Sequence, residues 1–185
     1  MRIIGGEYRS RTLNAPKGMT TRPTLDQTRE ALFNILQGRV ADAHFLDLYA
    51  GSGAVALEAV SRGAASAVLC DSSRAACACI RENIRRLGCE ARTRLLEIPD
   101  QRAIPLLERE GAQFDLIFLD PPYAMDLTPV LAALKGASLL AAGGLVIAEH
   151  AADTGFAPPE GWTLVRKKVY RDTALSFYEE DACAP

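Results

Sequence analysis

The sequence predicts a doubly wound α/β fold built on a mostly parallel, seven-stranded sheet. Five short apolar runs, typical of strands buried on both faces of a parallel sheet, alternate with segments of helical period. Near the end, residues 163–170 and 174–178 instead alternate polar and apolar positions on either side of a short turn, which predicts a closing antiparallel hairpin. A chain of 185 residues, 49% of them hydrophobic, is long enough for one such core.

The chain is expected to begin with a small extension to this sheet. Residues 1–21 mix arginines and glycines with isolated apolar residues, and the pattern leaves a short hairpin and an extended arm open. A helix should then start near Pro23, where Thr24 and Gln27 match a capping box, and Gly38 is placed to end it.

The remaining elements follow in the order that a doubly wound sheet requires. Ser72 or Ser73 can cap the second helix after the extension, and Gly88 is placed to stop it. We expect the five parallel strands at 44–49, 67–71, 94–98, 114–119 and 145–149, with helices at 54–62, 74–87, 104–110 and 128–134 between them.

The charge distribution divides the chain near residue 40. The first 40 residues contain seven basic and three acidic side chains, a net of +4, which leaves −6 for the rest of a chain whose total is −2. We therefore separate a basic N-terminal arm and helix (1–40) from a Rossmann-like domain (41–185). A basic arm on an acidic body favours a polyanionic partner met at one end, although a solvated extension is the alternative. The candidates for substrate contact are Arg9, Arg11, Arg22 and Thr24.

Composition also limits which cellular compartment and which kinds of metal site or disulfide we expect. No apolar run approaches the roughly 20 residues needed to span a bilayer, and residues 1–20 lack the apolar core of a secretory signal. The five cysteines form no C-x-x-C pair, and His44 and His150 do not complete a zinc site. We expect a cytoplasmic protein without a metal ion, whose cysteines are reduced and structural.

A rigid acidic loop follows the apolar run 114–119. It begins with Asp120-Pro121-Pro122-Tyr123, and neither proline can donate an N–H to a central ladder, so the chain must leave the sheet there. Open α/β sheets bind ligands at this carboxyl edge. The loop therefore presents a carboxylate and an aromatic ring to a ligand, although it can also serve only as a turn and a lid on the core.

Glycines after the run 44–49 form a second motif. Residues 51–56 satisfy G-x-G-x-x-A, and Asp71 lies twenty positions beyond Gly51, as in dinucleotide-binding proteins. Asp47 counts against NAD, because its charge suits a cationic ligand group, although a turn hydrogen bond is its alternative role. The chain also has no room for a separate substrate domain. The set therefore points to S-adenosylmethionine, with Asp47, Gly51, Gly53, Asp71 and Ser72 as cofactor-binding candidates.

With these motifs the sequence resembles the class I amino-methyltransferases. The likeness extends to MRIIGG at 1–6, RPTLDQTREALFNIL at 22–36, DLYAGSGAVALEAVSRGA at 47–64 and KVYRDTALSFYE at 168–179. Over nearly its whole length the chain resembles the RsmD family, bacterial 16S rRNA (guanine(966)-N2)-methyltransferases. It departs from that family at two places. Residues 97–103 (EIPDQRA) replace an Asp/Asn-Ala pair near the adenine, so Asp100 and Arg102-Ala103 both remain candidates, and Arg171 replaces a glycine.

The resemblance implies methylation of the exocyclic N2 amine of a loop guanine in 16S rRNA, within the small ribosomal subunit, by a monomeric enzyme. We expect Asp120 and the Pro121 carbonyl to hold the amine, with Asp120 as a positioning group first and a base second, and Tyr123 to stack on the base. Two other functions stay open. One is a DNA amino-methyltransferase acting on adenine N6 or cytosine N4, which usually carries an added recognition region. The other is a non-catalytic RNA-binding module with a vestigial cofactor site.

Overall fold

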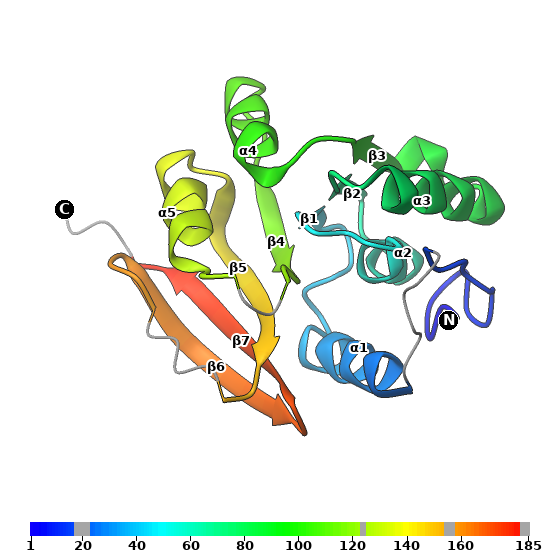
Figure 1. Ribbon diagram of the computed structural model, residues 1–185, viewed down its shortest axis with the longest axis horizontal. Helices are drawn as coiled ribbons and strands as arrows, with labels where there is room; N and C mark the ends of the chain where they lie inside the picture. The colour runs from blue at the N-terminus through cyan, green and yellow to red at the C-terminus, as the bar shows by residue number, and fades with distance from the viewer. Residues whose placement is uncertain (17–22, 123–124, 154–157, 182–185) are drawn as a thin grey trace.

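The computed structural model describes residues 1–16, 23–122, 125–153 and 158–181 (Figure 1). Within these residues, seven strands form a sheet in the order β3-β2-β1-β4-β5-β7-β6. The strands are β1 (His44–Asp47), β2 (Ser66–Cys70), β3 (Thr93–Leu96), β4 (Phe114–Leu119), β5 (Leu140–Ala151), β6 (Trp162–Tyr170) and β7 (Thr173–Glu180).

The pairing confirms the predicted fold class. The first five strands pair in parallel, and β7 pairs antiparallel with both β5 and β6 to make the closing hairpin. One strand differs from the prediction, because β5 starts at Leu140 and includes Gly143 and Gly144. A side chain at Gly144 would place Cβ 2.9 Å from the carbonyl oxygen of Asp115. The glycine therefore lets β5 stay close to β4 through a register shift.

Helices cover both faces of the sheet. The helices α1 (Pro23–Ile35), α2 (Ala54–Ser61) and α3 (Arg74–Leu87) pack in one apolar cluster against one face, and α4 (Asp100–Arg109) and α5 (Thr128–Gly136) pack against the other. Ser73 is the residue that caps α3, where its side chain accepts from the Ala76 N–H, and Gly88 ends that helix with φ +70°. In the described part of the chain, no helix has the length and apolarity to cross a membrane.

The cysteines are part of this packing. Cys70, Cys77, Cys79 and Cys89 are buried free thiols, and burial raises the pKa of each. Cys183 lies outside the described residues.

The first residues form a packed hairpin and not a solvated arm. Arg2 and Thr12 form an antiparallel bridge, and Ile3, Tyr8 and Leu13 are buried in the cluster that contains α1, α2 and α3. The turn of this hairpin lies beside the last residue of α2, where the Glu7 N–H donates to the Ser61 carbonyl. The basic extension is therefore continuous with the core of the sheet.

A buried carboxylate on α2 holds this hairpin in place. Glu58 is fully buried, and it accepts hydrogen bonds of 2.8 Å from the backbone N–H groups of Ile4 and Gly5. Arg62 Nε lies 2.7 Å from the same carboxylate, and Arg29 Nε, from α1, lies at 3.8 Å. Glu58 thus joins the hairpin, α1 and α2 at one point.

Replacing Glu58 by alanine should lower the free energy of unfolding by about 3–5 kcal/mol, because two backbone donors and two arginines would lose their shared buried partner. Urea unfolding measures this loss. Glu82→Ala is the matched control, because Glu82 pairs with Arg85 on an exposed surface of α3 and such pairs contribute about 1 kcal/mol or less. Equal losses in the two variants would contradict the role given to Glu58.

Candidate active site

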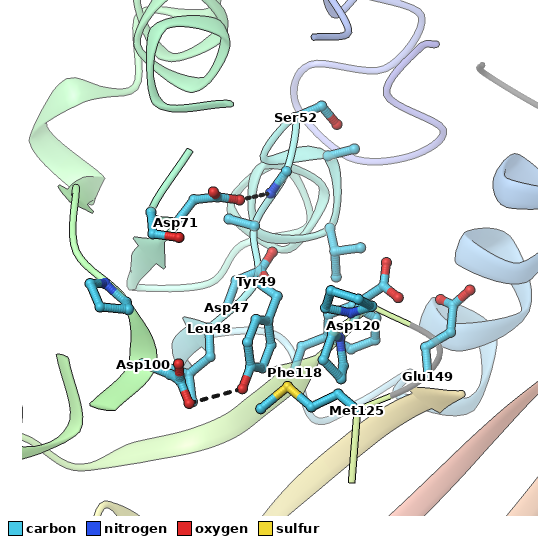
Figure 2. Close-up of a pocket in the computed structure, with 18 of the residues that line it drawn as sticks. Asp47, Leu48, Tyr49, Ser52, Asp71, Asp100, Phe118, Asp120, Met125 and Glu149 are labelled. Carbon is cyan, nitrogen blue, oxygen red and sulfur yellow. Dashed lines mark hydrogen bonds between the residues drawn. The ribbon is translucent and has the colours of Figure 1, made fainter. Parts of the chain in front are cut away.

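A cavity of about 670 Å³ opens at the carboxyl edge of the sheet, within the size range of small-molecule sites (Figure 2). Each of the five parallel strands, or the segment that follows it, contributes an acidic residue to the cavity wall. In sheet order from β3 to β5, these residues are Asp100, Asp71, Asp47, Asp120 and Glu149.

Asp71 organises the glycine turn after β1. Its Oδ2 accepts from the Gly51 N–H at 2.8 Å and its Oδ1 accepts from the Ser73 N–H at 2.8 Å. Gly51, Asp71 and Ser72 all line the cavity, as expected for cofactor-binding residues. The carboxylate keeps unused lone pairs on both oxygens, so it can still accept hydrogen bonds from ligand hydroxyl groups.

Gly53 shapes the turn that leads into α2. It precedes α2 with φ +78°, and an added Cβ would lie 3.0 Å from Leu69 Cδ2 and 3.4 Å from Ile80 Cγ1. Gly53 is not among the residues that line the cavity. The left-handed turn and the neighbouring core side chains therefore favour glycine here, and a contact between Gly53 and the cofactor stays a prediction.

Asp47 is the most buried acid of the site. It is 1% exposed, and its Oδ1 has no hydrogen-bond partner among the described residues. Burial, with the nearby Asp120 carboxyl, raises the pKa of Asp47 to about 8. A buried acceptor without a donor suits a cationic ligand group, which would both supply the hydrogen bond and favour the ionised carboxylate. The ammonium of S-adenosylmethionine fits this position.

The end of the cavity beside β3 is formed by Asp100 and its neighbours. Tyr49 Oη donates to Asp100 Oδ2 at 3.0 Å, and Ile98 and Pro99 add apolar surface. Of the two candidates that the sequence left open, Asp100 lines the cavity, whereas Arg102 and Ala103 do not appear among its lining residues. Apolar surface beside one acceptor suits a heterocyclic base with an exocyclic amine.

Two carboxyl groups mark the opposite end. Asp120 follows β4 and faces the open cavity, and Glu149, near the end of β5, is 8% exposed (Figure 2). Loss of solvation raises the pKa of both groups, and the charge of the Asp120 carboxyl adds to the shift of Glu149. Pro121 also lines this end. We did not predict Glu149 from the sequence, although a signal was present, because it ends an apolar run just as Asp47 does.

The hairpin reaches the cavity through Met1, and its other end is linked to the glycine turn through Asn83. Met1 is part of the cavity wall, and Ser52 Oγ donates to its sulfur at 3.6 Å. Asn83, fully buried on α3, donates to the carbonyls of Ser52 and Asn14 and accepts from the Asn14 N–H. Asn83 therefore fixes the glycine turn relative to the hairpin. These polar contacts join residues too far apart in the sequence for any local pattern to reveal them.

The predicted substrate contacts are not gathered at the cavity. Arg11 donates to the Arg86 carbonyl at 2.9 Å, at the C-terminal end of α3, and Arg9 is exposed on the same hairpin. Neither arginine is among the residues that line the cavity. Tyr123, Arg22 and the side chain of Thr24 lie outside what the structure describes.

Comparisons with known proteins agree on one family. The family model described as "Conserved hypothetical protein 95" matches residues 1–179. The chain is 35% identical to "Ribosomal RNA small subunit methyltransferase D" of Escherichia coli strain K12, over 98% of this chain and 91% of that protein. It is 30% identical to "Putative rRNA methyltransferase YlbH" of Bacillus subtilis strain 168, over 97% and 99%. The solved structure "Putative methyltransferase yhhF from Escherichia coli" superposes with a TM-score of 0.85 at 36% identity and covers 98% of both chains.

Asp47 should make cofactor affinity depend on pH. A pKa of about 8 keeps this carboxyl largely protonated at neutral pH, and an ammonium bound beside it favours ionisation, so binding should release a proton. Affinity for S-adenosylhomocysteine, which has the same ammonium, should therefore rise with pH up to pH 8, by at most about tenfold per pH unit. Calorimetric titrations over this range measure the effect.

The control for this prediction is Asp47→Asn. Asp71, Asp120 and Glu149 face the same cavity and can also titrate, so only loss of the pH dependence in this variant assigns it to Asp47. An unchanged pH profile in Asp47→Asn would show that another carboxyl group controls binding.

Proposed function

The chain belongs to the family described as conserved hypothetical protein 95, and from that membership we propose that it methylates ribosomal RNA with S-adenosylmethionine as the methyl donor. The finer proposal is that the acceptor is the exocyclic N2 amine of a guanine in 16S rRNA. The relatives support the RNA substrate, because the names of those compared above include a small-subunit rRNA methyltransferase and a putative rRNA methyltransferase.

The observation that carries the proposal is that one cavity contains both a candidate site for the methyl donor and a candidate site for the acceptor base. Beside β2 and β1, Asp71 and the unpartnered Asp47 oxygen suit a ribose and an ammonium. Beside β4, Asp120 and Pro121 open onto the same space. A donor held at the first site therefore points its reactive group toward an acceptor held at the second.

S-adenosylmethionine supplies an activated methyl group to a nucleophile that approaches in line with the bond to sulfur. The task of the protein is alignment, because an exocyclic amine conjugated with its ring is a weak nucleophile. In our proposal, Asp120 and the Pro121 carbonyl accept the two N–H bonds of the amine and turn its lone pair toward the methyl group. Asp120 can also take up the proton that is lost, and the sequence predicts Tyr123 as the stacking partner of the base.

Glu149 supports guanine as the target base. In guanine one of the two ring nitrogens beside the amine is N1, which carries a hydrogen, whereas adenine and cytosine present a lone pair at the ring nitrogen beside theirs. Burial raises the pKa of Glu149, so its carboxyl needs a hydrogen-bond donor to favour the ionised form at neutral pH. The N1–H of guanine is such a donor while Asp120 accepts from N2, whereas a lone pair at that position does not favour ionisation. In our proposal, this coupling favours guanine over adenine or cytosine.

The two alternatives are less well supported. A DNA amino-methyltransferase with an added recognition region is disfavoured, because this chain and the rRNA relatives cover each other over nine tenths or more of their lengths. A vestigial module would have no need for the unpartnered buried acid at Asp47. We further propose that the enzyme acts as a cytoplasmic monomer on the small ribosomal subunit or its precursor.

The function is tested with labelled S-adenosylmethionine and separate samples of small-subunit rRNA, small-subunit particles and DNA. Label should appear in the RNA or the particle as N2-methylguanine. Asp120→Asn, which keeps an acceptor oxygen, should retain measurable activity, whereas Asp120→Ala should lose roughly a hundredfold or more. Transfer to DNA instead of rRNA would overturn the proposal, and equal losses in the two variants would show that proton acceptance dominates.

Glu149 is tested with an RNA in which 2-aminopurine, which has the amine but no N1–H, replaces the target guanine. The wild type should prefer guanine by about 1–3 kcal/mol in kcat/KM, the size expected for one well-placed hydrogen-bonding pair. Glu149→Gln should lose most of this preference and keep its affinity for S-adenosylhomocysteine. A preference that survives the substitution would remove Glu149 from base recognition.

A further inference from the structure

The acids are arranged along the sheet so that the cofactor end and the acceptor end of the cavity lie on different strands. Asp71 on the β2 side belongs to the cofactor end, and Asp120 and Glu149, after β4 and in β5, belong to the acceptor end. The next strands outward from Glu149 are β7 and then β6, which forms the edge of the sheet (Figure 1). An RNA strand whose target base lies between Asp120 and Glu149 can therefore continue over the β7–β6 side.

Strand β6 presents a basic, exposed surface on that side. Arg166, Lys167 and Lys168 are consecutive and exposed, and none of them forms an ion pair within the described ranges. Val165 and Val169, which flank them, are 45% and 56% exposed. We call residues 165–169 the β6 basic edge. The facing stretch of β7, residues 174–178, is buried and contains no acidic residue.

Sheet register connects the β6 basic edge to the acceptor end. Lys168 pairs with Leu175 on β7, and Leu175 pairs with Glu149 on β5, so Lys168 and Glu149 lie in one row on one face. Arg166 pairs with Phe177, two residues along β7, and so lies on the same face as Lys168. With neighbouring strands about 4.8 Å apart, the backbone of Lys168 is roughly 10 Å from that of Glu149. A few nucleotides of extended RNA cover this distance.

The basic residues of the N-terminal hairpin are less suitable for this role. The hairpin turn contacts Ser61 and Arg92, at the end of α2 and just before β3, so it lies at the amino edge of the sheet. Arg11 is already bonded to backbone carbonyls of α3. Many other arginines are paired with acids, including Arg81, Arg85, Arg92 and Arg94.

A second explanation exists for lysines on an edge strand, because such charges prevent pairing with the edge of another molecule. That role requires only that the strand be charged. It does not require two basic side chains on the face of the acceptor-end acid, one of them in its row, on a domain whose remaining charge is negative.

We infer that the β6 basic edge binds the phosphates of the RNA strand next to the target nucleotide, with Arg166 and Lys168 as the main contacts. This inference rests on the proposed rRNA substrate. It goes further by naming the surface over which that RNA lies and by excluding the hairpin turn as the principal contact.

The test compares two double variants, Arg166→Gln/Lys168→Gln on β6 and Arg85→Gln/Arg109→Gln as a control. The control removes the same charge from two exposed arginines near the C-terminal ends of α3 and α4. Binding of a small-subunit rRNA fragment is measured across a series of salt concentrations. Each lost phosphate contact should lower the slope of log affinity against log salt by about 0.7 for single-stranded RNA. The β6 variant should therefore show a slope lower by roughly 1.4, a higher KM for RNA and an unchanged kcat.

Two controls keep the result specific. Thermal unfolding and S-adenosylhomocysteine binding should match the wild type in both variants. Lys168→Glu provides a second β6 variant, in which a single substitution makes the same net charge change. The inference would be overturned if both β6 variants keep the wild-type salt slope, or if the α3–α4 control shows an equal decrease. If the β6 variants keep the wild-type slope and form dimers, the charges protect the edge strand. If the wild-type protein methylates rRNA, these outcomes reject only the surface. If it methylates no rRNA, the proposed function fails, and the inference fails with it.

Discussion

Carboxyl groups that converge on one cavity are the constraint on which this site depends. Each parallel strand delivers one acid to the same edge, and withdrawal from water makes every negative charge there costly. Two of the acids have protein donors, since Asp71 accepts from two backbone N–H groups and Asp100 accepts from Tyr49. Asp47 Oδ1 has none in the described residues. The structure therefore supplies donors to Asp71 and Asp100 and leaves a buried oxygen of Asp47 without one.

This arrangement has a cost in stability. The pKa of Asp47 is about 8 in the folded protein against an ordinary value of 3.8, so between these values the native state holds a proton that the unfolded chain has released. The free energy of unfolding then decreases as pH rises through this window. The two apolar clusters on either side of the sheet must offset that loss, and a cationic ligand beside Asp47 would remove part of it.

Local patterns in the sequence predicted the fold and some of the acidic residues that line the cavity. Apolar runs located the strands, and Asp71 and Asp120 were visible because each ends a strand beside a recognisable turn. The packing of the hairpin could not be predicted, since it depends on Glu58 and Asn83, which lie 53 to 69 residues beyond their partners. The fifth strand was predicted to start at residue 145, after Gly143 and Gly144, because the fit of this pair within the strand depends on the neighbouring backbone of β4. The core side chains that crowd Gly53, Leu69 and Ile80, could not be predicted for a similar reason, since they are distant in the sequence.

The hairpin also affects how the protein is synthesised. Its residues leave the ribosome before their partners exist, because Glu58, Asn83 and Arg86 are translated 53 to 75 positions later than the groups that they bind. At about 5–20 residues per second, the segment waits several seconds or longer with Ile3, Tyr8 and Leu13 exposed to other proteins. The cavity wall that contains Met1 is thus completed only after α3 has emerged. The residues made earliest therefore cannot complete the cavity wall until their partners on α2 and α3 have been made.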